Sequence, residues 1–178
     1  MAERVAPLAV DRVVEALVDL PADSWTVLHG LRLPDRRRVI DHVLVGPSGV
    51  HVVSTDTWHG QVRGRALRDA ADAADSVASY LTSVIRDEVR PVLCHHTDEY
   101  VDAWRDGVVV ASAGTIVELV SARRAVLEPD EVRAVALELS GLETPAEDGK
   151  RPVGSHRAVT ERRRSNLRLV RRSAPLPL

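Results

Sequence analysis

Apolar side chains recur along the chain at two spacings, and the spacing separates helices from strands. Near the N-terminus the helical spacing predicts an amphipathic helix over 8–19, closed by Pro21, whose apolar stripe is Leu8, Val10, Val13, Val14, Leu17 and Val18. An alanine-rich stripe with the same period predicts a long helix over 66–86. Two shorter helices are expected over 115–122 and 129–139.

Short β-rich runs lie between these helices. They predict strands over 25–31, 39–45, 50–56, 91–94 and 107–112. The four residues 46–49 read Gly-Pro-Ser-Gly, a turn sequence that should join the second and third runs as a hairpin. This order predicts an α/β fold in which helices flank a mixed sheet with a central hairpin.

The length of 178 residues suits one compact domain, which we expect over 7–140. Residues 1–140 carry 15 basic and 22 acidic side chains, whereas 141–178 carry 9 and 4. The second segment is also rich in Pro, Gly, Ser and Arg, which predicts a flexible C-terminal tail. No apolar run is long enough for a membrane span and no secretory signal is visible, so the expected location is the cytoplasm, with no membrane partner.

The hairpin carries a recognisable motif. Residues 40–50 read IDHVLVGPSGV and are followed by Trp58-x-Gly60. This stretch resembles the signature of the NERD (nuclease-related domain) family, which is similar to the PD-(D/E)XK restriction-endonuclease-like superfamily. The runs 25–29 and 90–94 also fit, so the resemblance spans about 11–139. It implies a restriction-endonuclease-like sheet and, in active members, Mg²⁺-dependent cleavage of DNA.

Cleavage of a phosphodiester with Mg²⁺ requires converging carboxylates and a cation that stabilises the negative charge of the transition state. The family pattern places Asp at the position of Asp41, an acidic residue at that of Ser54, and Lys at that of Asp56. This chain keeps only Asp41, which is therefore the candidate metal ligand. Ser54 is a neutral hydroxyl, and Asp56 reverses the charge that the cation would supply.

The hairpin register decides whether these positions meet. With a two-residue turn at 47–48, Asp41 lies across from Ser54 at about 5 Å between Cβ atoms, and Ser54 and Asp56 share a face about 7 Å apart. A turn with a bulge at Gly49 would shift the register by one residue and turn Asp41 away. The sequence leaves both registers open.

Other residues could compensate for the two departures. Arg63 or Arg65, just beyond the strand, could supply a migrated cation, and Glu15 or Asp11 could be the acid that the superfamily places on the first helix. In the plainer interpretation these helix acids only face solvent, and residues 54–56 end an inactive strand. We therefore expect no cofactor, or Mg²⁺ if the chain is active.

The histidines and the single cysteine give no metal motif. His95 and His96 follow Cys94, but neighbouring strand residues point to opposite faces, so the three cannot grip one ion, and exposure at a strand end explains the two histidines more simply. His42, His51 and His59 have no carboxylate or thiolate partner at the spacing of known metal-ligand motifs. Cys94 lies in a short apolar run, which indicates a small buried hydrophobic residue.

The predicted tail contains a group of arginines that could contact the phosphates of DNA or RNA, or an acidic partner; these are Arg162, Arg163, Arg164, Arg168, Arg171 and Arg172. A solvated, unstructured extension explains the same composition. No aromatic residue accompanies the arginines, so contact with nucleic acid would be independent of sequence.

Three functions remain. The chain is interpreted as a catalytically degenerate nuclease fold that works as a nucleic-acid-associated or scaffold module. The first alternative is an active Mg²⁺-dependent DNA nuclease with a migrated cation. The second is a protein-interaction domain, which the acidic composition of 1–140 favours, because a domain that grips DNA through its core should be basic.

Overall fold

A computed structural model describes residues 11–34, 39–56, 62–81 and 83–143. The strands in these residues are β1 (Thr26–Leu31), β2 (Ile40–Gly46), β3 (Gly49–Asp56), β4 (Val89–His95), β5 (Asp102–Arg105) and β6 (Val108–Ser112). The helices are α1 (Arg12–Leu17), α2 (Gly64–Tyr80), α3 (Ser83–Arg86), α4 (Ile116–Ser121) and α5 (Pro129–Ser140). The predicted α/β class is confirmed.

The strands form one mixed sheet in the order β1-β2-β3-β4-β6-β5. The first three strands are antiparallel, β4 and β6 run parallel to β3, and β5 pairs antiparallel with β6. Helix α2 makes the crossover between the parallel strands β3 and β4, as such a connection requires. The hairpin predicted over 39–56 therefore lies inside the sheet.

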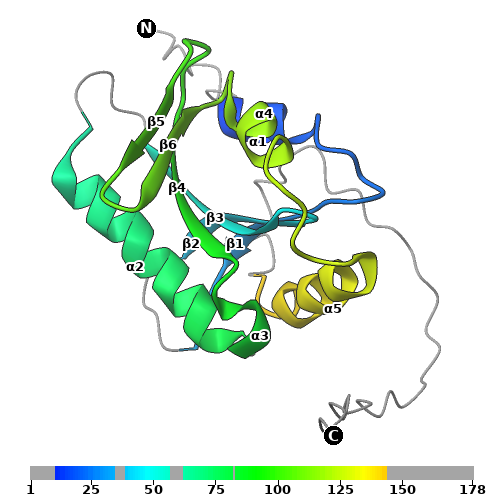
Figure 1. Cartoon of the computed structure of the whole chain (residues 1–178). Helices are drawn as coiled ribbons and strands as arrows, with labels where there is room; N and C mark the ends of the chain where they lie inside the picture. The colour runs from blue at the N-terminus through cyan, green and yellow to red at the C-terminus, as the bar shows by residue number, and fades with distance from the viewer. Residues whose placement is uncertain (1–10, 35–38, 57–61, 82, 144–178) are drawn as a thin grey trace, which may run out of the picture.

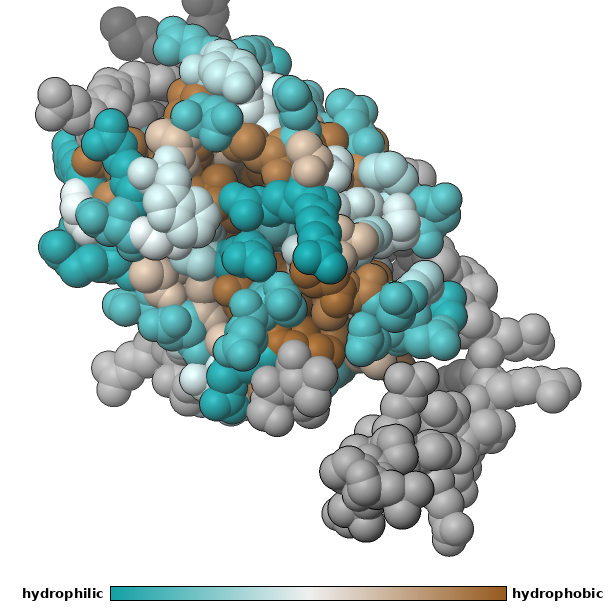
Figure 2. Space-filling model, in the orientation of Figure 1, coloured by the Kyte–Doolittle hydropathy of each residue, from teal (hydrophilic) through white to brown (hydrophobic). Residues whose placement is uncertain are grey.

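Helices cover both faces of this sheet (Figure 1). On one face α2 and α5 pack against side chains such as Val50 and Val52. On the other face α1 and α4 pack against Leu44, Val53 and Val92. Hydrophilic side chains cover most of the surface turned to the viewer in Figure 2, with apolar side chains visible in its middle.

Two glycines fix the tight turn between β2 and β3. Gly46 and Gly49 face each other as Cα partners, which confirms the two-residue turn and its register. A Cβ on Gly46 would lie 2.3 Å from the Trp25 ring. Gly49 has φ +114°, and a Cβ there would lie 2.6 Å from the carbonyl oxygen of Glu88. Both sites therefore require glycine.

Three predicted boundaries differ from the structure. The helix predicted over 66–86 is interrupted, because Leu81 is extended with ψ 159° before α3 begins at Ser83. Strand β5 was not predicted, although the Asp106-Gly107 pair, with φ of 49° and 81°, is typical of a hairpin turn. Leu142 and Glu143 contact β1 beyond the predicted boundary at 140, where Leu31 faces Glu143.

The predicted tail beyond residue 143, with its arginines, lies outside the described residues. Residues 8–10, the start of the helix predicted over 8–19, also lie outside them. Within the described ranges, none of the helices combines the length and the apolar character needed to cross a membrane.

Candidate functional site

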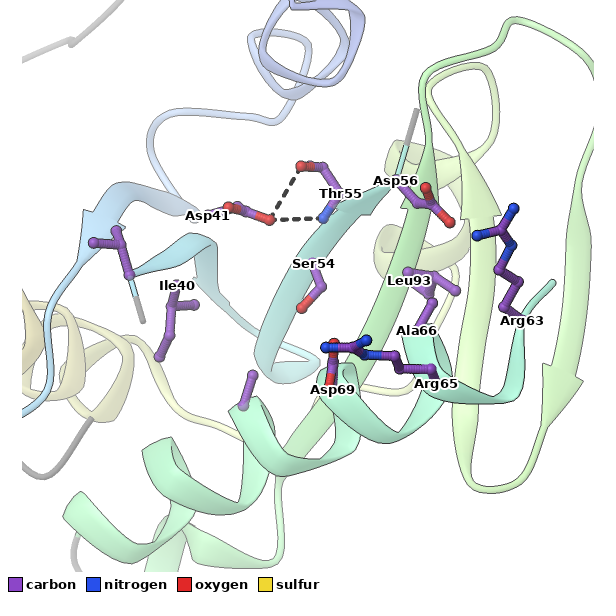
Figure 3. A pocket seen from close by; sticks show the side chains of 12 residues that line it. Ile40, Asp41, Ser54, Thr55, Asp56, Arg63, Arg65, Ala66, Asp69 and Leu93 are labelled. Carbon is purple, nitrogen blue, oxygen red and sulfur yellow. Dashed lines mark hydrogen bonds and ion pairs between the residues drawn. The ribbon is translucent and has the colours of Figure 1, made fainter. Parts of the chain in front are cut away.

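A pocket of about 290 Å³ lies between the hairpin and the first half of α2 (Figure 3). The hairpin contributes the beginning of β2 and the end of β3. The lining residues are Val39, Ile40, Asp41, Ser54, Thr55, Asp56, Arg63, Arg65, Ala66, Asp69, Ala73 and Leu93. The pocket thus gathers Asp41, Ser54 and Asp56, the three positions of the sequence motif.

The hairpin register explains why these three positions meet. His42 and Val53 are the last paired residues of the ladder, so the next step along the two strands places Asp41 beside Ser54. Ser54 and Asp56 are two residues apart on one strand and share its α2 face. The register predicted from a two-residue turn is the one observed, and the shifted register is excluded.

The Asp41 carboxylate is held by Thr55 in the neighbouring strand. The backbone N–H of Thr55 donates to Asp41 Oδ2 at 2.8 Å, and the Thr55 hydroxyl donates to the same oxygen at 3.1 Å. The Asp41 side chain thereby links β2 to β3 just beyond His42 and Val53, the last paired residues of the two strands. Thr55 was not predicted as a site residue, because a strand period of two turns its side chain away from the face that Ser54 and Asp56 share.

The candidate cations lie on the helix side of the pocket. Arg63 is the N-cap residue of α2, and Figure 3 shows Arg63 and Asp56 pointing toward one another. Arg65 Nε lies 3.9 Å from Asp69 Oδ2, and the Arg65 side chain is 84% exposed, so this ion pair is weak. Both arginines line the pocket that contains Asp41.

Asp69 is the second lining residue that the sequence analysis missed. It lies three residues after Ala66 and four before Ala73, which is the spacing of one helix face, and all three line the pocket. The helical period could have indicated this position, but Asp69 is one of three aspartates, with Asp72 and Asp75, beside the alanine stripe, and such a row resembles an ordinary solvated helix face.

The residues at the motif positions do not fit a Mg²⁺ site. The ion prefers octahedral coordination by oxygen, usually through one or two carboxylates plus water and substrate phosphates. Ser54 offers a neutral hydroxyl, and one oxygen of Asp41 already accepts two hydrogen bonds. In the part of the chain that the structure describes, no three His, Cys, Asp or Glu side chains are arranged to hold a metal ion.

The candidate acids of α1 lie elsewhere. Helix α1 packs on the sheet face opposite α2. Glu15 is 53% exposed and lies 3.9 Å from Arg12, while Asp11 caps α1 by accepting hydrogen bonds from the backbone of Val13 and Val14. Neither acid lines the pocket, so the structure does not bring Glu15 together with Asp41.

Burial explains Cys94 and two of the histidines. Burial raises the pKa of the Cys94 thiol to about 12, so the thiol stays protonated, as expected for a buried hydrophobic residue. Burial, followed by the charges of Arg123 and Arg90, lowers the pKa of His51 to about 3. His95 is only 7% exposed, because β4 lies between β3 and β6, so its interpretation as an exposed strand end was wrong.

The comparison with protein-family models agrees with the motif. The sequence model of the family described as "Nuclease-related domain" (NERD) matches residues 8–94. Among solved structures, the small subunit (R.BspD6I2) of the heterodimeric restriction endonuclease R.BspD6I is similar with 10% identity and a TM-score of 0.27, over 74% of this chain and 78% of that chain. No curated protein matches. The match over residues 8–94 includes the motif and all the pocket-lining residues, and it identifies a nuclease-related domain in this part of the chain.

Proposed function

We propose that this chain is a nuclease-related module that has lost cleavage and acts as a nucleic-acid-associated or scaffold protein. The observation that carries the proposal is the pair of side chains on the α2 face of β3. Ser54 and Asp56 line the pocket beside Asp41, where cleavage would need an acidic ligand and a cation. Ser54 places a neutral hydroxyl where an acidic ligand is required, and Asp56 places a negative charge where a cation is required.

The electrostatics of the pocket support this conclusion. A carboxylate at position 56 repels the negative charge that develops on a phosphate under attack, whereas catalysis requires groups that stabilise that charge. The lining residues include three carboxylates, Asp41, Asp56 and Asp69, against two guanidinium groups. Arg65 is directed to Asp69, and Arg63 points toward Asp56, so the cations compensate acids of the pocket itself.

The role of Asp41 explains how the motif acid is useful without catalysis. Its carboxylate accepts two hydrogen bonds from Thr55 and joins β2 to β3 at the pocket. Bonds to a charged acceptor are stronger than bonds between neutral groups. Asp41 therefore serves the fold whether or not a metal binds.

An active nuclease with a migrated cation is the second candidate. It is favoured by one observation, that Arg63 and Arg65 line the same pocket as Asp41. In that case Arg63 or Arg65 would stabilise the transition state in place of the lysine of the family pattern. Asp69, from α2, would then be the nearest substitute for the missing acid at position 54.

Calorimetric titration with Mn²⁺ separates the two candidates before any cleavage assay. The wild type should bind Mn²⁺ weakly, and Ser54→Glu with Asp56→Lys should bind it more tightly, because the change moves a carboxylate from position 56 to position 54, directly across from Asp41. Ser54→Ala is the matched control and should leave the affinity unchanged. Tight binding by the wild type that disappears in Asp41→Ala would support the active nuclease instead.

A further inference from the structure

Strand β5 forms an edge of the sheet that no other described strand covers. It pairs only with β6 and ends the strand order, and Figure 1 shows it as the outermost strand on its side of the sheet. Two aromatic side chains are exposed here, Tyr100 at 76% and Trp104 at 59%. The Tyr100 hydroxyl lies 3.5 Å from Asp102 Oδ2, and both side chains face solvent. An open edge is a template for pairing with another chain, and an exposed tryptophan is typical of protein interfaces.

The turn between β5 and β6 determines which backbone groups of β5 point outward. Residues 106–107 form a two-residue turn. The residues on either side of such a turn form a hydrogen-bonded pair, and hydrogen-bonded and non-hydrogen-bonded pairs alternate along the ladder. The N–H and C=O groups of Arg105 and Ala103 therefore bond to β6. Those of Asp102 and Trp104 point away from the sheet and are available to a further strand.

A second copy of β5 fits this edge in one register. Two copies related by a two-fold axis pair antiparallel, and the residue on the axis faces itself. With Ala103 on the axis, Asp102 of each copy lies opposite Trp104 of the other, so the outward backbone groups bond to one another and only small side chains meet at the axis. An axis at Asp102 would oppose two carboxylates, and an axis at Trp104 would oppose Asp102 to Asp106 of the second copy. Like charges directly opposite each other are destabilising, which disfavours both alternatives.

The side chains are complementary in this register. Asp102 and Trp104 lie on the sheet face that carries α4, because their β6 partners Ala111 and Val109 belong to the core on that face. The Cζ atom of Arg123, just beyond α4, lies 5.9 Å from the centre of the Trp104 ring. No carboxylate of the described residues forms an ion pair with Arg123. Directly opposite residues have Cβ atoms about 4.5–5.5 Å apart, so Asp102 of the second copy reaches Arg123 beside the Trp104 ring, and the two-fold axis repeats this ion pair.

We propose that β5 is a dimerisation edge, at which two copies of this chain pair through residues 102–105 in the register centred on Ala103. The pairing joins the two six-stranded sheets into one continuous sheet. A stable interface uses roughly 20–30 residues from each partner, so an edge of four residues predicts a weak dimer that depends on concentration. The proposal does not depend on whether the pocket cleaves nucleic acid, because the pocket lies between the hairpin and α2.

Sedimentation equilibrium of the full chain, over about a hundredfold range of concentration, measures this dimer. The wild type should pass from monomer to dimer as the concentration rises. Asp102→Arg opposes a cation to Arg123 of the second copy, and Arg123→Asp opposes an anion to Asp102, so each change should raise the dissociation constant at least about tenfold. Circular dichroism checks that both variants fold. Glu138→Arg, at an exposed position of α5, is the matched control and should dimerise as the wild type does.

An equimolar mixture of the two variants is the decisive sample. In a mixed dimer each new arginine meets a new aspartate, and the retained Arg123 meets the retained Asp102, so the mixture should dimerise although neither variant does so alone. A mixture that stays monomeric, or a wild-type dimer that neither variant weakens, would overturn the proposal. A wild type that is monomeric at every concentration would also overturn it. Binding of a single-stranded oligonucleotide that Trp104→Ala abolishes would then assign this edge to nucleic acid instead.

Discussion

The two hydrogen bonds from Thr55 to Asp41 predict a measurable stability cost for loss of the motif carboxylate. Asp41→Ala leaves the backbone N–H of Thr55, which donates at 2.8 Å, without its acceptor in a partly buried position. An unsatisfied buried donor costs about 1–3 kcal/mol. The hydroxyl of Thr55, at 3.1 Å from the same oxygen, can turn to water and adds less. We therefore expect a loss of about 2 kcal/mol in the free energy of unfolding.

Urea unfolding followed by tryptophan fluorescence measures this cost. In a thermal unfolding experiment, a loss of about 2 kcal/mol in a domain of this size would appear as a fall of about 4–8 °C in Tm. Thr55→Val, which removes only the hydroxyl, should cost about 1 kcal/mol. Ser54→Ala, in the same pocket, is the matched control and should cost less than either. If Asp41→Ala is no more destabilising than Ser54→Ala, the reasoning about the carboxylate is wrong.

Three further predictions follow from other parts of the chain. Burial lowers the pKa of His51 to about 3 in the folded chain, so the free energy of unfolding should fall by about 1.4 kcal/mol per pH unit as the pH drops below 6.5. Urea unfolding at pH 6.5 and at pH 5.0 should show a smaller loss of this free energy in His51→Gln than in the wild type, and equal losses would contradict the assignment. Gly46→Ala forces a methyl group against Trp25 and should cost about 1–3 kcal/mol by urea unfolding, whereas no change would mean that the ring moves freely. If the arginines at 162–164 contact nucleic acid, duplex affinity should fall steeply with salt, and changing them to Gln should flatten that dependence; a salt-insensitive affinity would exclude this mode.

The sequence was sufficient for the hairpin, because residues 46–49 form a recognisable turn. It left the register open between a two-residue turn and a bulge at Gly49, and the pairing of Gly46 with Gly49 in the structure decides it. The strand period alone predicted that Ser54 and Asp56 share a face, whereas the position of Asp41 beside Ser54 required the register. These are local rules, and tertiary contacts did not override them.

Other features depend on tertiary packing that a single sequence does not display. Apolar residues at helical spacing continue past Tyr80 with Leu81 and Val84, but the chain leaves the helix at Leu81. Asp69 lines the pocket because α2 packs against β3, and Thr55 enters the site through its hydrogen bonds to Asp41 across the strand pair. Glu15 was a candidate by analogy, yet packing places α1 on the opposite face of the sheet.

The proposed function requires that the pocket has lost cleavage because of Ser54 and Asp56. A plasmid-nicking assay with Mg²⁺ or Mn²⁺, on the wild type, Asp41→Ala and Ser54→Glu with Asp56→Lys, tests it most directly. We predict no metal-dependent nicking by the wild type or by Asp41→Ala, and weak nicking by the double variant. Robust nicking by the wild type that Asp41→Ala abolishes would contradict the claim, and would make Arg63 and Arg65 the next residues to change.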